Sequence, residues 1–209
     1  MSKTKKKNYD PGIAIRSADA FFNHAEPFLR QIGTDMSSAH VNAMGDLGGF
    51  VASATNLALS TELYLKSLWM MLGYPVPEHH KLWPLYKRLP SVRIKGEILS
   101  SYDHHNQMFG DQVAALELAI SKGPADQQAL DEESRKAQKQ NEDSSLAAVL
   151  RRSSDAFIVW RYLHEQAADS GVRIIRYEFL RIRLVATCAR TSAVSLFQGK
   201  RSVQSKEAT

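Results

Sequence analysis

Apolar side chains recur every three to four residues through most of the chain, which is the spacing that places them on one face of an α-helix. Short runs rich in proline, glycine and serine separate these stretches. Pro27 predicts a kink or a break inside the first helix. We therefore expect an all-α protein, an up-and-down bundle of four to five core helices joined by short connections. The pattern predicts helical segments, from which this core is drawn, over about 13–32, 41–72, 81–89, 92–107, 111–121, 156–168 and 176–197.

The second of these stretches is the most apolar, and from Phe50 onward its leucine, tryptophan and methionine side chains cover almost every direction around the helix. A helix that is apolar nearly all round is a central, buried one. Its two charged residues, Glu62 and Lys66, lie four positions apart in the order that favours an ion pair. Gly73 is predicted to end the helix.

The charge is concentrated at the two ends of the chain. The sequence has 209 residues and a net charge of +5, of which residues 1–12 carry +3 and residues 199–209 carry +2. We expect both segments to be disordered basic tails on a single domain over 13–198. Residues 126–143 hold six acidic and three basic side chains and few large apolar ones. We therefore expect 124–152 to be a charged insertion, either an exposed helix or a disordered segment.

Composition excludes several classes of protein. A single cysteine, Cys188, cannot form an intramolecular disulfide or a cysteine-rich metal site. No apolar run approaches the roughly 20 residues that span a bilayer, and no secretory signal follows the basic N-terminus, so we expect a cytoplasmic protein without a membrane partner. The pairs His79-His80 and His104-His105 lack the spacing of a metal site. No glycine-rich phosphate loop is present, so we expect no cofactor.

Three local patterns occur in a distinctive order. The first contains Glu62-Leu63-Tyr64-Leu65-Lys66, the second begins at His80-Lys81-Leu82, and the third contains Trp160-Arg161-Tyr162 followed by His164 and Glu165. Together they resemble the HEPN family, the helical domains of prokaryotes and higher eukaryotes, over residues 45–90 and 153–197. The resemblance implies a helical bundle, often a homodimer, that binds nucleotide or RNA. It also implies a setting in prokaryotic defence or toxin–antitoxin systems, with an antitoxin or nucleotidyltransferase as a possible partner.

Many members of that family are metal-independent endoribonucleases that use an arginine and a histidine four to six residues apart. No arginine in this sequence has a histidine at that spacing after it. Arg161 and His164 have only two residues between them. The leading hypothesis is therefore a binding module without standard catalysis. One alternative is an endoribonuclease that uses Arg161 and His164 as catalytic residues in a non-standard layout, with histidine moving a proton and arginine holding phosphate charge. The other alternative is a purely structural scaffold subunit.

Further candidate residues come from charge and spacing. A carboxylate at position 62 in so apolar a helix requires a partner, and Arg161 is the predicted one; Arg161 can also pair with Glu165. Arg176, Arg183 and Arg190 are spaced by seven and are expected on one face of the last helix, either as a phosphate-binding stripe or as an ordinary solvated face. The candidate binding residues are thus Glu62, Lys66, His80, Tyr162, Glu165, Arg176, Arg183 and Arg190.

Overall fold

A computed structural model describes residues 10–35, 47–109, 116–121, 127–140, 143–154 and 172–207. This part of the chain confirms the all-α helical fold expected from the sequence, and it adds a short pair of strands. The elements are, in chain order, α1 (Pro11–Asp35), α2 (Leu47–Met71), α3 (Leu82–Lys87), α4 (Val92–Phe109), β1 (Leu116–Ser121), α5 (Gln127–Gln140), α6 (Leu146–Arg152), β2 (Val172–Tyr177) and α9 (Phe179–Glu207).

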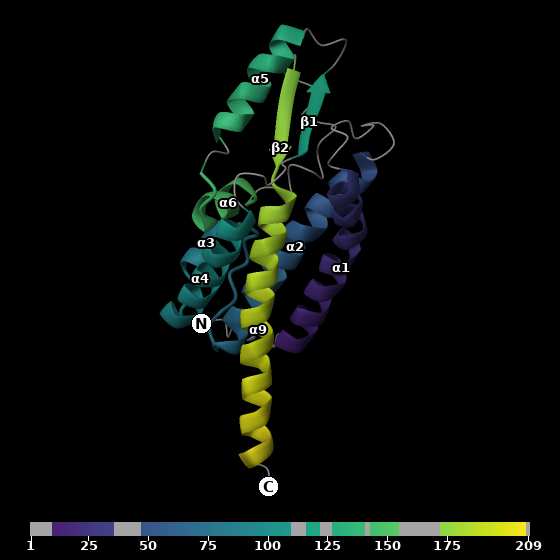
Figure 1. Cartoon of the computed structure of the whole chain (residues 1–209). Coiled ribbons are helices and arrows are strands. Elements are labelled where there is room, and N and C mark those ends of the chain that lie inside the picture. Colours follow the sequence, from purple (N-terminus) through teal and green to yellow (C-terminus); the bar gives the residue numbers. More distant parts are fainter. Residues whose placement is uncertain are drawn as a thin grey trace, which may run out of the picture.

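Helix α2 is the centre of the bundle. It packs against α1 on one side and α9 on another, and α4 packs against α9 (Figure 1). Leu57 and Leu68 of α2 have no solvent exposure, and Leu65 is 1% exposed. This burial is what an almost wholly apolar helix requires. Figure 1 also shows α9 running the length of the bundle and continuing past the ends of the other helices.

Gly73 ends α2 as the sequence predicts. Its φ angle is +79°, a left-handed conformation in which a Cβ atom would be strained. Its N–H donates to the carbonyl of Met70 at 3.0 Å, and the N–H of Tyr74 donates to the carbonyl of Trp69 at 3.2 Å. These two hydrogen bonds form a Schellman motif, which turns the chain away from the helix axis.

The helix predicted over 111–121 is wrong for residues 116–121, which form strand β1. Strand β1 pairs antiparallel with β2, with Leu116 opposite Tyr177 and Ser121 opposite Val172. The sequence Leu-Glu-Leu-Ala-Ile-Ser also has the alternation of a strand, and a partner more than 50 residues away in sequence decides between the two readings. Because β2 ends at Tyr177, the last helix begins at Phe179 rather than near Arg176.

Two segments expected to be exposed or disordered are partly helical and packed. Leu146 and Val149 of α6 are 1% exposed and Leu150 is fully buried, so the end of the expected insertion belongs to the core. Residues 199–207 continue α9 instead of forming a disordered tail. There the Lys200 ammonium group donates to the carbonyl of Met71, which anchors the extension to the end of α2.

Helix α5 is exposed along most of its length, which agrees with the exposed-helix alternative for the middle of the insertion. The break expected at Pro27 does not occur, because Pro27 lies inside the continuous helix α1. The described residues contain no helix with the length and apolar content needed to cross a membrane.

Candidate functional site

Three of the predicted binding residues come together beside the start of α3. Glu62 on α2 is 4% exposed. The Lys66 ammonium group lies 2.8 Å from Glu62 Oε1, and Nδ1 of His80 lies 2.9 Å from Oε1 and 3.1 Å from Oε2. A carboxylate only accepts hydrogen bonds, so the Nδ1 atom of His80 carries the donated proton. Glu62 therefore fixes the orientation of a lysine and of a histidine whose side chain is 58% exposed.

The fold brings His80 back to Glu62 across 18 residues of sequence. The Schellman motif at Gly73 reverses the chain, and α3 then packs on α2 through Leu82 and Leu85, which are 1% and 0% exposed. The indole N–H of Trp69 donates to the carbonyl of Leu85 at 3.1 Å. These apolar contacts hold the first turn of α3, and with it the adjacent His80, at a fixed place over α2.

His79 adds a second imidazole to the cluster. Its Nδ1 atom is buried and has no hydrogen-bond partner among the described residues. Burial lowers the pKa of His79 below its ordinary value, and the positive charges of Lys66 and Arg88 lower it further. His79 is therefore neutral near pH 7 and adds no positive charge to this surface.

The surface next to the cluster is strongly basic. Residues 79–95 contain five lysine or arginine residues and no acidic residue. Helix α3 has six residues and is therefore about 9 Å long, so charges at its start and its end lie within reach of neighbouring phosphates of one nucleic-acid strand. The exposed cations are Lys81, Lys87, Arg88 and Arg93, and half-buried Lys95 completes the set.

Helix α6 contributes from the other side of α3. The guanidinium group of Arg151 lies over the ring of Trp83, 4.6 Å from its centroid. Lys81 precedes α3 without a side-chain cap, and instead the N–H of Trp83 donates to Ser154 Oγ at 3.2 Å. The end of α6 is thus fixed against the start of α3, which places Arg151 at the same surface as Lys81.

The expected arginine stripe does not form. Arg176 lies in strand β2, opposite Glu117 of β1, and not on the last helix. Arg183 and Arg190 lie on α9, where their Nε atoms donate at 2.6 Å to Glu26 and Asp19 of α1, respectively. These two arginines join α9 to α1. The hydrogen bond to Asp19 also raises the pKa of Arg190. Both arginines thus pair with carboxylates of a packed neighbouring helix, which the spacing of seven alone does not reveal.

The remaining predicted residues lie outside the described part of the chain. They are Arg161, Tyr162, His164 and Glu165, which include both candidate catalytic residues of the endoribonuclease alternative. The predicted ion pair between Glu62 and Arg161 lies outside it for the same reason. Lys66 and His80 supply Glu62 with partners in the described residues.

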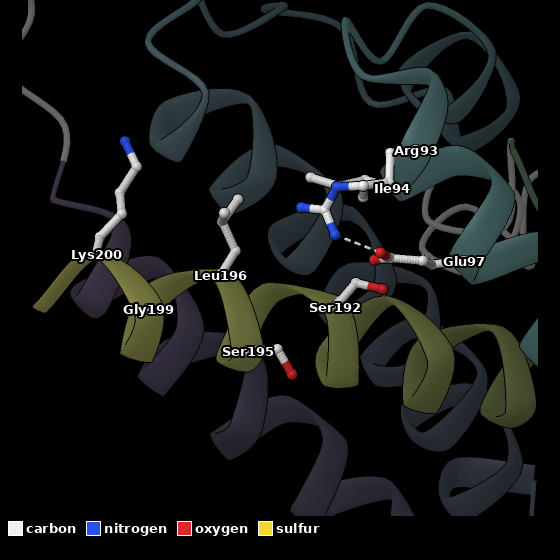
Figure 2. A pocket seen from close by; sticks show the side chains of 8 residues that line it. All are labelled: Arg93, Ile94, Glu97, Ser192, Ser195, Leu196, Gly199 and Lys200. Carbon is white, nitrogen blue, oxygen red and sulfur yellow. Dashed lines mark hydrogen bonds and ion pairs between the residues drawn. The ribbon is translucent and has the colours of Figure 1, made fainter. Parts of the chain in front are cut away.

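A groove between α4 and α9 is separate from this cluster and contains none of the predicted residues. Its volume is about 520 Å³. Figure 2 shows Arg93 directed at Glu97 on one wall and Lys200 at the opposite end. Both cations have partners, since Arg93 pairs with Glu97 and Lys200 donates to the carbonyl of Met71. The groove is therefore a weaker candidate for binding an anionic ligand than the surface around α3.

Sequence reasoning missed Trp83, Arg151 and the basic run over 79–95. Counting charges over the first half of the chain would have found the run, because no acidic residue interrupts it. No sequence signal could have identified Arg151, because its place at this surface depends on the packing of α6 beside α3.

No protein-family model, no curated protein and no solved structure matches the chain. The geometry around α3 and the resemblance described above are therefore the basis for a functional proposal.

Proposed function

We propose that this chain is a HEPN-like helical module that binds RNA or a nucleotide through the basic surface around α3, as a binding protein without standard catalysis. The single observation that carries the proposal is the Glu62 cluster, where a buried carboxylate orients Lys66 and His80 at the edge of a surface rich in cations. The family resemblance is the basis for adding a homodimeric state and a role in prokaryotic defence or a toxin–antitoxin system.

Clustered positive charge on a rigid scaffold favours nucleic-acid binding at the surface around α3. Phosphate contacts from lysine and arginine supply most of the affinity of a protein for nucleic acid. Here Lys81, Lys87, Arg88 and Arg151 are exposed around one short helix that is held by buried leucines. Cations on a rigid scaffold lose little conformational freedom when they bind, which favours binding over a similar number of charges on a disordered tail.

The experiment measures binding of a fluorescently labelled 12-residue single-stranded RNA by anisotropy, over a series of salt concentrations. Wild-type affinity should fall steeply with salt. The double variant Lys87→Gln/Arg88→Gln should bind more weakly and show a salt slope smaller by about 1.4, because each lost phosphate contact to a single strand changes the slope by about 0.7.

The matched control is Arg135→Gln/Lys139→Gln, which removes one arginine and one lysine from the exposed face of α5. It should bind like the wild type. Absence of binding by the wild-type protein at low salt would refute the proposed function. Equal losses in the two double variants would show that net charge, and not the surface around α3, determines binding.

A further inference from the structure

The stack of Arg151 on Trp83 is a feature that phosphate binding alone does not use. Arg151 is exposed and Trp83 is half-buried, with 4.6 Å between the guanidinium carbon and the ring centroid. A guanidinium group held over an indole ring is attracted by the electrons of the ring, so its position is restrained before any ligand arrives.

Both partners of the stack are held by the core. Trp83 lies between Leu82 and Leu85 in sequence, which are 1% and 0% exposed. Arg151 directly follows Leu150, which is fully buried. Ser154 Oγ links the two helices, since it donates to the carbonyl of Leu150 at 2.6 Å and accepts from the N–H of Trp83 at 3.2 Å. The stack is therefore a preformed element of the surface.

A flat cation at a basic surface has a specific use in nucleic-acid binding. Guanidinium planes and aromatic rings stack against unpaired bases, whereas bases within a duplex are already stacked on one another. We propose that Arg151, supported by Trp83, is the stacking site for one unpaired base, so that the ligand of this surface is single-stranded RNA rather than a duplex. This inference rests on the proposed function and specifies its ligand.

The key variant is Arg151→Lys, which keeps the positive charge and removes the flat guanidinium group. It is compared with Arg135→Lys, the same exchange at an exposed arginine of α5, outside the basic surface. Each protein is titrated with the single-stranded 12-mer, with a duplex of that sequence, and with a 12-residue ribose-phosphate strand that lacks bases. Far-ultraviolet circular dichroism confirms that each variant is folded.

The wild type should bind the single strand roughly five-fold or more tightly than the strand without bases, which is the effect expected for stacking of one base. It should also prefer the single strand to the duplex. Arg151→Lys should lose most of both preferences and keep the salt slope of the wild type. Arg135→Lys should behave like the wild type.

The outcomes separate this inference from the proposed function. If the wild type binds none of the three ligands, the proposed function fails and the stacking site fails with it. If the wild type binds all three equally, or Arg151→Lys keeps the preference for bases, RNA binding stands and the stacking site is refuted.

Discussion

Helices α2 and α5 carry the same local pattern and place it in opposite surroundings. Each has a glutamate four residues before a lysine, with nitrogen–oxygen distances of 2.8 Å for Glu62 and Lys66 and 3.0 Å for Glu132 and Lys136. The side chains of the first pair are 5% and 13% exposed, and those of the second are 67% and 55% exposed. The comparison teaches that the burial around an ion pair, and not its sequence spacing or its nitrogen–oxygen distance, decides how much the pair contributes to folding stability.

The surroundings differ because the rest of each helix differs. Around the α2 pair lie fully buried residues such as Leu65 and Leu68, so water cannot solvate a carboxylate left without a partner. The α5 pair is solvated with or without its partner, and surface pairs of this kind contribute little. The buried pair can hold His80 in place for the same reason, since its geometry is fixed by the packing around it.

The largest difference between the two helices should appear in their leucines. Leu68→Ala removes a fully buried side chain from α2 and should lower the free energy of unfolding by about 4 kcal/mol. Leu130→Ala on α5 removes a half-buried side chain and should cost about 1 kcal/mol. Urea unfolding followed by circular dichroism measures both values. Similar losses would mean that α5 belongs to the same packed core as α2.

The charges should show a smaller difference in the same direction. Glu62→Gln leaves the half-buried charge of Lys66 uncompensated and should lower the free energy of unfolding by about 3 kcal/mol. Glu132→Gln should leave stability almost unchanged, because Lys136 remains solvated and close to Glu133. The same unfolding assay applies. A neutral result for Glu62→Gln would show that the buried pair contributes no net stability.

The smallest expected effect is the pH dependence of stability near α2. The folded-state pKa of His79 is lowered, so below about pH 6.5 the unfolded chain binds a proton that the folded chain resists. The contribution of neutral His79 to the free energy of unfolding is therefore complete above that pH and is lost as the pH falls. His79→Gln should therefore lose less stability than the wild type between pH 7.5 and 5.5. Parallel curves for the two proteins would rule out this role of His79.

Much of the bundle could be predicted from local pattern. The spacing of apolar residues predicted α1, α2, α3 and α4, and the conformation of Gly73 followed from its place after an apolar helix. The strands and α6 could not be predicted in this way. Strand β1 depends on a distant partner, and α6 presents only a few apolar residues, whose burial depends on α3 and α9.

In the candidate site, too, local contacts could be predicted from the sequence, whereas contacts between elements could not. Glu62 and Lys66 share a helix, so their pairing followed from spacing alone, and the family resemblance added His80. The partner of His80 and the stack of Arg151 on Trp83 required the packing of α3 between α2 and α6. The arginines at 183 and 190 taught the reverse lesson, because a regular spacing on a helix does not reveal which face a neighbouring helix will cover.

The hydrogen bond from Trp83 to Ser154 has a consequence for the order of folding. It joins residues 71 positions apart, and a helix of six residues is too short to be stable before its tertiary contacts form. On a ribosome, α3 can pack on α2 first, but its contact with α6 must wait until Ser154 has been synthesised and has left the exit tunnel. The proposed binding surface would mature late, after α1 and α2 have already paired.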